Sequence, residues 1–336
     1  MIDKIEYISK VEINSLWDTY NFKWNLNADI NILSGINGSG KSTILDCIAA
    51  LIGNFELPKN ITDNVKNIII TFNNGKTISF ENIEDTIKNL EIKAKTNRKY
   101  KNIVSDIRKN EGEDYKKIKS VKLGLVALDD LKLTHKELHE IINVDIISTF
   151  DNVISNSELK FDSDVKTELD RELFILQKKY LDYQLNIGKR AFEIISNLNN
   201  SSESLDDVKN IKKQHEIFIE IINNLFSSTN KKINLEKNEL TFLFNKKEIS
   251  IYKLSSGEKQ ILLILLTILL QDNKQSIIFM DEPEISLHFD WQKKLIEYIK
   301  ILNPNSQIII ATHSPAVIME GWLNKVCNME DLKTLK

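Results

Sequence analysis

Hydrophobic and polar positions predict strands around one helix in the N-terminal part of the chain. Ile5–Ile13 alternates β-branched and polar residues, and Ala28–Gly35 is a strand that leads into a glycine. Ser42–Gly53 has the apolar spacing of a helix and stops at a glycine. Asn67–Phe80 predicts a hairpin that turns at Asn74 and Gly75.

The middle of the chain predicts two long helices. A first apolar stripe alternates spacings of four and three, as in a coiled-coil seam: Leu169, Leu173, Leu176, Tyr180, Tyr183 and Ile187. A second stripe follows: Val208, Ile211, Phe218, Ile222 and Leu225, with His215 on it. The polar segment Asn197–Ser204 separates them. We therefore expect an antiparallel hairpin packed as a bundle within the domain rather than as a long arm, with His215 half-buried rather than a ligand.

One strand, Val144–Phe150, is expected before the two helices, and strands return after Thr229 and then alternate with helices. The later expected strands are Lys232–Glu236, Glu239–Phe244, Lys247–Tyr252, Ser276–Met280 and Gln307–His313. A long apolar helix contains Ile261–Leu270, and another helix covers Asp290–Leu302. The alternation predicts an α/β protein.

Length and composition bound the class of protein. The 336 residues allow two domains, or one large α/β domain with an insertion, and 42% hydrophobic residues are enough for a substantial core. Cys47 and Cys327 lie far apart, so zinc and disulfides are not expected. Ile261–Leu270 is about half a membrane span, and the N-terminus has no apolar signal region. We expect a soluble cytoplasmic protein without a membrane partner.

Charge leaves nucleic acid open as a partner. The net charge is −3, which indicates no global basic field. Ile92–Lys122, however, holds eleven Lys or Arg against four Asp or Glu, with Tyr100 and Tyr115 among them. This stretch is a solvated face or a patch for nucleic acid or another acidic partner.

The segment Gly35–Thr43, GINGSGKST, is a phosphate-binding motif between a predicted strand and a predicted helix. Glycines let backbone N–H groups curl around phosphate oxygens, and the helix amino terminus adds positive charge. Lys41 would reach the β- and γ-phosphates, and Ser42 would offer a hydroxyl to Mg²⁺. The full set of expected nucleotide contacts is Asn37, Gly38, Ser39, Gly40, Lys41, Ser42 and Thr43.

Two further strand ends carry candidate catalytic groups. Asp281 and Glu282 follow a buried strand, where ligands sit in a parallel sheet. Asp281 would hold Mg²⁺, and Glu282 would act as the general base on water. His313 ends another such strand and can hydrogen-bond the γ-phosphate or the attacking water.

Ser255, Ser256 and Gly257 stand at the start of the apolar helix. Unsatisfied N–H groups there, with the Ser255 hydroxyl, can bind an anion. Helix capping by Ser255, with Glu258 completing a capping box, explains the same residues. The spacing does not separate the two interpretations.

The order of these motifs along the chain resembles that of ATP-binding-cassette ATPases. In this resemblance, LSSGE of this chain corresponds to the signature LSGGQ of the family. The likeness covers about Met1–Ile83 and Ile233–Lys336. It implies a mixed central sheet, an N-terminal antiparallel β subdomain, and ATP held between two copies. Ser255, Ser256, Gly257 and Glu258 would then contact the partner's ATP.

The motif sequences resemble those of SMC/RecF-like ATPases and of the overcoming-lysogenization-defect family more than those of transporter ATPases. More narrowly, they resemble the Septu and retron-associated stand-alone ATPases of anti-phage defence. Ser256 and Glu258 depart from the signature, and no aspartate stands in Ile285–His288. No glutamine of this sequence can be assigned to the metal-sensing position of the family, and Asp151 stands at roughly that position. Trp17, Tyr20 or Trp24 could stack on adenine, although each is expected in the core.

We expect a head formed by residues 1–150 and 230–336, with a helical insertion at 151–229. The resemblance implies an ATPase that dimerises, or forms a higher oligomer, and gates a separately encoded effector such as a nuclease, because no room for a nuclease domain remains after Pro315. Alternatives are a DNA-repair or chromosome-associated ATPase, which binds DNA through Arg98, Lys99 and Lys101, a transporter subunit, and a non-hydrolysing scaffold. Intact Glu282 argues against the scaffold.

Overall fold

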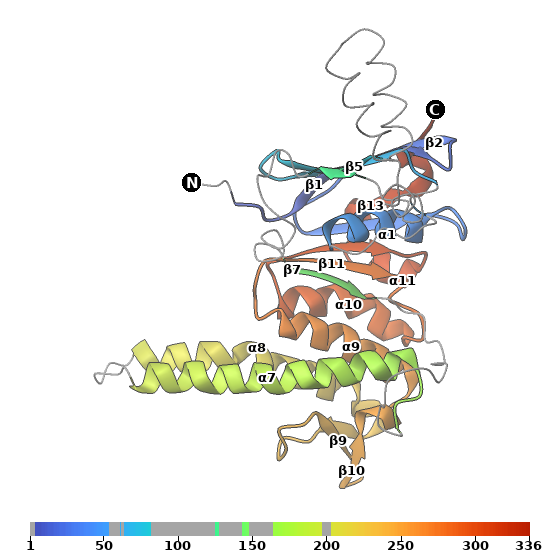
Figure 1. Ribbon diagram of the computed structural model, residues 1–336. Helices are drawn as coiled ribbons and strands as arrows, with labels where there is room; N and C mark the ends of the chain where they lie inside the picture. Colours follow the sequence, from blue (N-terminus) through green and yellow to red (C-terminus); the bar gives the residue numbers. More distant parts are fainter. Residues whose placement is uncertain are drawn as a thin grey trace, which may run out of the picture.

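The elements of the chain stack in layers (Figure 1). The computed structural model describes residues 4–53, 61, 64–81, 125–127, 143–147, 164–196 and 203–336. From one end to the other, the layers are an antiparallel sheet, one helix, a parallel sheet, a layer of helices, a helical hairpin and a small sheet. This is the α/β fold that the motif order implies.

The antiparallel sheet has the strand order β14-β2-β1-β4-β5-β6. Its strands are β1 (Ile8–Leu16), β2 (Tyr20–Asn25), β4 (Asn67–Phe72), β5 (Thr77–Glu81), β6 (Leu125–Ala127) and β14 (Lys333–Leu335). Alternate residues of β4 and β5 face the core, as period-two patterning dictates. The predicted hairpin is confirmed, with Gly75 at φ 78° in its turn.

The central sheet is parallel and has the order β13-β3-β12-β11-β7. Its strands are β3 (Ile30–Ser34), β7 (Asn143–Ile147), β11 (Ser276–Asp281), β12 (Ser306–Ala311) and β13 (Val326–Asn328). In the described residues the central sheet is parallel throughout rather than mixed, and the expected N-terminal antiparallel β subdomain is the separate sheet that contains β1 and β2. Because the strands run the same way, their carboxyl ends share one edge of the sheet.

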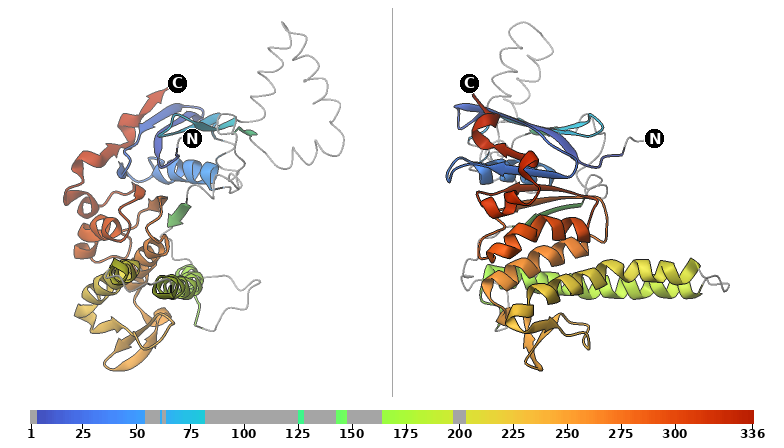
Figure 2. Two further views of the ribbon diagram at one scale, coloured as in Figure 1. Left: turned by 90° about the vertical axis from the view of Figure 1, so that its left-hand side faces the viewer. Right: turned by 180° about the vertical axis from the view of Figure 1, so that it is seen from behind.

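The two faces of the parallel sheet carry different helices. Residues alternate across β11, so that Ile277 and Phe279 pack in one core with α1 (Lys41–Ile52). Ile278 and Met280 pack in a second core on the other face. That second core includes α9 (Ser256–Leu270) and α10 (Phe289–Leu302). The helix after the phosphate loop and the helix after the signature thus lie on opposite faces (Figure 2).

The remaining elements are short. A three-stranded antiparallel sheet contains β8 (Lys231–Ile233), β9 (Thr241–Phe244) and β10 (Lys247–Ser250). The last residues of the expected third strand instead form a 3-10 turn at Ile251–Lys253, with Ser250 as its N-cap. The short helical elements are α11 (Pro315–Met319) and 3-10 turns at Ser227–Thr229, Leu323–Lys325 and Met329–Leu332.

The predicted hairpin consists of α7 (Glu168–Ser196) and α8 (Glu203–Leu225). The seam of α7 is buried as its spacing predicts, from Leu169 to Ile187. His215 is half-buried on the facing stripe, and its Nε2 lies 2.7 Å from the Tyr180 hydroxyl. Burial lowers the pKa of His215, with a smaller opposing effect of Glu216. The interpretation of His215 as a stripe residue is confirmed.

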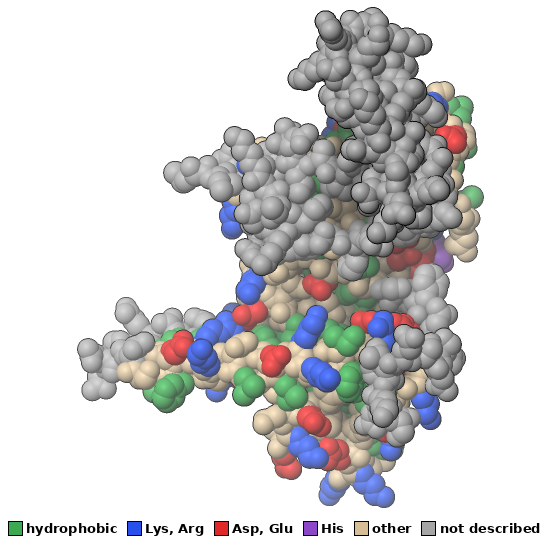
Figure 3. All heavy atoms as spheres, in the orientation of Figure 1, with side chains coloured by type: hydrophobic (Ala, Val, Ile, Leu, Met, Phe, Trp, Pro, Cys, Tyr) green, Lys and Arg blue, Asp and Glu red, His purple; other side chains and the backbone are tan. Residues whose placement is uncertain are grey.

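The prediction that this hairpin stays within the domain is wrong in part. Its base packs on α9, whereas its far end extends beyond the layers as an arm (Figures 1 and 2). The seam residues of the two helices pack against each other, and near the base they share one core with α9. Apolar side chains on the outside of the arm remain exposed, including Leu185 and Phe192, each at 71% (Figure 3).

Candidate nucleotide site

The loop between β3 and α1 lies at the carboxyl edge of the parallel sheet. Gly38 and Gly40 have φ angles of 78° and 101°, a region that side chains rarely adopt. The loop turns tightly into the amino terminus of α1, where N–H groups and the helix dipole favour an anion. Asn37 and Gly38 are exposed, Thr43 is half-buried and Ser39 is buried. The predicted phosphate loop therefore has the required shape.

Trp17 covers this loop. A Cβ at Gly40 would lie only 2.1 Å from Trp17 Cη2, so only glycine permits the contact. Trp17 itself has φ 51° in the turn between β1 and β2. Trp24 is 1% exposed and belongs to the core, as expected. Trp17 is half-buried: it packs against the edge of the same core, as expected, and its ring also lies against the phosphate loop.

Lys41 is buried within the loop that it follows. Its side chain is 5% exposed, and Nζ donates hydrogen bonds to the carbonyls of Gly35 at 3.1 Å and Ile36 at 3.4 Å. Nζ also lies 3.5 Å from Glu282 Oε1. A buried ammonium requires such partners. The contact joins the phosphate loop to the end of β11 and brings together two residues that the sequence predicts in one site.

Ser42 and Asp281 also meet. Burial raises the pKa of Asp281, and a hydrogen bond from the Ser42 side chain opposes the shift. A hydroxyl and a carboxylate in contact supply the oxygen ligands that Mg²⁺ prefers. The residues present therefore fit the predicted metal ion.

Glu282 and His313 form a pair beside Lys41. His313 Nδ1 lies 2.8 Å from Glu282 Oε1. Glu282 is 8% exposed and has φ 48°, and its N–H donates to the Ala311 carbonyl at 2.8 Å. Oε2 of Glu282 is buried without a hydrogen bond among the described residues. An unpaired buried carboxylate oxygen is able to accept a proton from water.

Glu284 is a site residue that sequence reasoning missed. Its Oε1 accepts hydrogen bonds from the Thr312 hydroxyl and, at 3.2 Å, from the Ser314 N–H. Burial raises the pKa of Glu284 to about 7, and the neighbouring Glu282 adds to the shift. Carboxylate or ring atoms of Glu282, Glu284 and His313 all lie within 4.8 Å of one another. The spacing of Glu282 and Glu284 was the only available signal, since Thr312 is distant in the sequence.

Glu284 gives a pH-dependent prediction. Its folded pKa lies above its unfolded value, so its stabilising effect is complete below about pH 4.5 and is lost as pH rises through about 7. Glu284→Gln keeps the acceptor oxygen but cannot ionise. The difference in unfolding free energy between Glu284→Gln and wild type should therefore change in favour of the variant by on the order of 1–3 kcal/mol from pH 5 to pH 8. Urea unfolding at both pH values measures this, and an equal difference at both would contradict it.

The signature residues begin α9 with a reciprocal cap. The Glu258 N–H donates to Ser255 Oγ at 3.3 Å, and the Ser255 N–H donates to Glu258 Oε2 at 2.8 Å. The capping interpretation is thus correct for Ser255 and Glu258. Ser255 and Ser256 nevertheless remain exposed at the helix amino terminus. The Ser255 hydroxyl itself donates to Glu258 Oε2 at 3.0 Å, so an anion at this end of α9 would be bound by backbone N–H groups rather than by that hydroxyl.

Glu258 has a structural reason to replace the usual glutamine. It is 1% exposed, and Lys231 Nζ lies 2.8 Å from both carboxylate oxygens. Burial alone would raise the pKa of Glu258, but hydrogen bonds from Lys231, Ser255 and Thr229 hold it below its usual value. A neutral glutamine would leave Lys231 without its ion pair.

Gly257 touches the loop that follows β11 and Glu284. A Cβ at this position would lie 2.3 Å from the backbone oxygen of Ser286. Ser286 has φ 66°, in the loop that leads from Glu284 to α10. The signature glycine is therefore needed for packing within the chain, in addition to any role toward a ligand.

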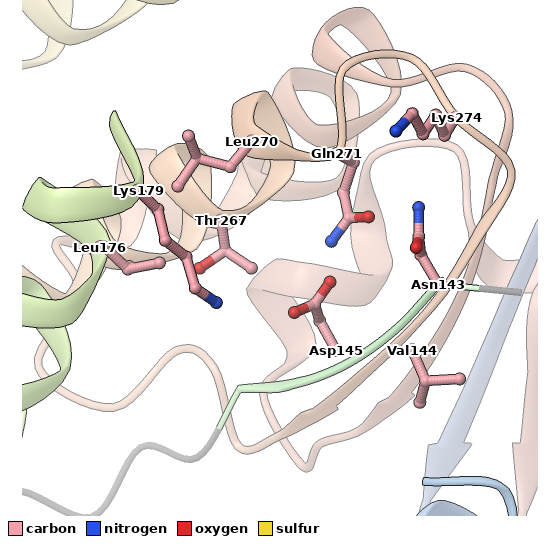
Figure 4. A pocket seen from close by; sticks show the side chains of 9 residues that line it. All are labelled: Asn143, Val144, Asp145, Leu176, Lys179, Thr267, Leu270, Gln271 and Lys274. Atoms are coloured by element: carbon pink, nitrogen blue, oxygen red, sulfur yellow. The ribbon is translucent and has the colours of Figure 1, made fainter. Parts of the chain in front are cut away.

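A separate cavity of about 320 Å³ lies at the amino half of β7, between α7 and α9 (Figure 4). Side chains that line it include Asn143, Asp145, Lys179, Gln271 and Lys274. Burial raises the pKa of Asp145, and Lys179 opposes the shift. Because ligands of a parallel sheet bind at its carboxyl ends, this cavity is distinct from the nucleotide site.

Two predicted features fall outside the described residues. They are Asp151, the candidate for the metal-sensing position, and the basic stretch Ile92–Lys122. Within the described part of the chain, none of the helices combines the length and apolar character needed to cross a bilayer.

Proteins named as ATPases are among the relatives of this chain. A region of the retron relative named "Retron Vc95 probable ATPase", from Vibrio cholerae serotype O1 biovar El Tor, is 28% identical over 209 residues, which are 58% of this chain and 37% of that protein. "Septu protein PtuA" from Bacillus thuringiensis is 25% identical over 341 residues, 95% of this chain and 74% of that protein. The chain thus spans well under half of the retron relative.

The fold has solved counterparts. An SMC head, solved in complex with the C-terminal winged-helix domain of ScpA, aligns with a TM-score of 0.56 and 17% identity over 94% of this chain and 91% of that one. At this identity the likeness shows the fold alone. A family model described as "AAA domain, putative AbiEii toxin, Type IV TA system" matches residues 30–320. The chain therefore belongs to this family of AAA-domain ATPases, with an SMC-like head and relatives among the retron and Septu ATPases.

Proposed function

We propose that the chain binds ATP with Mg²⁺ and hydrolyses it. Lys41 and the loop N–H groups would hold the phosphates, while Ser42 and Asp281 would bind Mg²⁺. Glu282 would take a proton from the attacking water, and His313 would orient Glu282 and the γ-phosphate. The support is the meeting of Lys41, Glu282 and His313 at one sheet edge.

We further propose that two copies enclose two ATP molecules. This proposal is supported by the position of α9, which lies on the opposite face of the parallel sheet from α1, and by the exposure of Ser255 and Ser256 at its start. An anion site that faces solvent at a helix amino terminus suits the ATP of another copy. A two-fold symmetric pair would complete both sites at once.

The proposed output is control of a separate effector, such as a nuclease, in anti-phage defence. Relatives named as retron and Septu proteins support this role. We also propose that residues 151–229 form an insertion between the two parts of the head. The α7–α8 arm offers a surface, away from the nucleotide site, on which such an effector could act.

Mixing two inactive variants tests the shared site. Glu282→Gln removes the base but keeps the signature. Ser256→Glu keeps the base but places a negative charge where the γ-phosphate would bind. An acid in the first turn favours the helix by about 0.3–1 kcal/mol, so unfolding would not explain lost activity. Each variant alone should lose at least about a hundredfold in ATPase rate.

Each mixed pair would contain one complete site. After random exchange of subunits, the mixture should recover about a quarter of the wild-type rate. Equal total protein of each variant alone is the control. A mixture no more active than the separate variants, in a protein shown to exchange subunits, would contradict the shared site and leave a single-copy hydrolase.

A further inference from the structure

The final strands of the chain lie directly behind the phosphate loop. We call residues 326–336 the tail brace. Its strand β13 pairs in parallel with β3, with Asn328 opposite Ser34, the last residue before the loop. Met329 is fully buried, and its Cβ would lie 3.1 Å from a Cβ on Gly35. The brace therefore packs against the first turn of the phosphate loop.

The brace also joins the loop to the turn that carries Trp17. Its second strand, β14, pairs antiparallel with β2, with Lys333 opposite Phe22 and Leu335 opposite Tyr20. The N–H of Lys336 donates to the Thr19 carbonyl at 3.0 Å. One short segment thus connects the parallel sheet, the antiparallel sheet and the phosphate loop between them.

Lys333 is the residue of the brace that reaches the loop. Its Nζ donates to the Ser39 carbonyl at 2.7 Å and lies 3.2 Å from Glu330 Oε1. The same ammonium lies 5.8 Å from the ring centre of Trp17 and 5.4 Å from that of Tyr20, within the range of cation–π attraction. The side chain is only 8% exposed, so its position is fixed.

We propose that Lys333 is a positioning residue for nucleotide binding. Ser39 C=O and Gly40 N–H belong to one peptide unit, and in a trans peptide they point in opposite directions. By holding the carbonyl on the outside of the loop, Lys333 directs the Gly40 N–H toward the phosphates on the inside. The inference rests on the proposed ATP binding, and it adds a residue outside the region that the family model matches.

The same contact orders Trp17. The Lys333 ammonium lies 5.8 Å from the centre of this ring, and the edge of the ring lies against Gly40 at the amino terminus of α1. The Lys333 charge also adds to the positive field of the loop, and partial burial reduces its screening by salt. Removal of Lys333 should thus loosen the loop and reduce its field together.

Lys333→Met keeps the aliphatic stem and removes the donor. Since a hydrogen bond from a charged group is involved, we expect Mg²⁺–ATP affinity to fall roughly ten- to hundredfold, measured by calorimetry on the full chain. Lys336→Met is the matched control, because it removes one charge from an exposed position of the same segment. Lys333→Arg keeps a donor and should restore affinity to within a few-fold of wild type.

Hydrogen exchange separates positioning from general destabilisation. In the nucleotide-free Lys333→Met protein, faster exchange should be confined to the phosphate loop and β14. Unchanged affinity and exchange in Lys333→Met, with tight binding by wild type, would overturn the role of Lys333. Faster exchange across the whole parallel sheet, or no recovery with Lys333→Arg, would also overturn it. Absence of ATP binding by wild type would instead refute the proposed function.

Discussion

Glu282→Gln is expected to slow ATP hydrolysis by about 10²–10⁴-fold, the usual contribution of a general base. Glutamine has nearly the same shape but cannot accept the proton of the attacking water. Nucleotide binding should persist, because the phosphate loop and Asp281 remain. The variant should therefore accumulate as a nucleotide-bound pair of chains.

Two measurements on Glu282→Gln separate catalysis from assembly. Phosphate release gives the hydrolysis rate, and light scattering after size separation, with and without ATP, gives the mass. Glu297→Gln is the control, since it removes an equal charge from an exposed position on α10. If Glu282→Gln hydrolysed ATP as fast as this control, Glu282 would not be the base.

Gly40→Ala is expected to be the most damaging small change in the phosphate loop. The new Cβ would meet Trp17 Cη2 at 2.1 Å and would occupy φ 101°. Left-handed strain costs about 1–3 kcal/mol, and overpacking costs a similar amount. The unliganded protein should therefore lose roughly 2–6 kcal/mol of unfolding free energy, and Mg²⁺–ATP binding should become undetectable at micromolar concentration.

The two costs of Gly40→Ala can be measured apart. Gly75→Ala is a matched control, because Gly75 has φ 78° but a Cβ there would meet none of the described atoms within 4 Å. It should show the backbone strain alone in urea unfolding. Trp17→Ala combined with Gly40→Ala should remove the clash and recover stability beyond the sum of the single changes. Strictly additive effects would show that Trp17 does not cover Gly40 in solution.

The sequence predicted those parts of the site that depend on short segments. The phosphate loop needs closely spaced glycines before a helix, and Glu282 needs a buried strand before it, so both can be recognised from a short stretch of sequence. Glu284 was missed because its role depends on burial and on Thr312, which arrives from another strand. Lys333 was missed because only the pairing of β14 with β2 brings it to Ser39.

The hairpin shows a different limit of sequence reasoning. The four-three spacing of Leu169–Ile187 correctly predicted a seam between two helices. It did not indicate how much of the helix pair packs on the rest of the domain, because the spacing identifies a buried stripe but not which elements cover it. Only the structure shows that the arm extends outward, because the exposure of Leu185 and Phe192 cannot be read from the sequence.

The contact between Gly257 and Ser286 bears on how two ATP molecules would be consumed. In the proposed pair, the signature that serves one nucleotide touches the loop that follows the base for the other. A shift of a few tenths of an ångström on one side must be accommodated on the other, since the backbone there has no spare room. We therefore expect the two sites to influence each other's affinity for ATP, with a sigmoidal dependence of rate on ATP concentration.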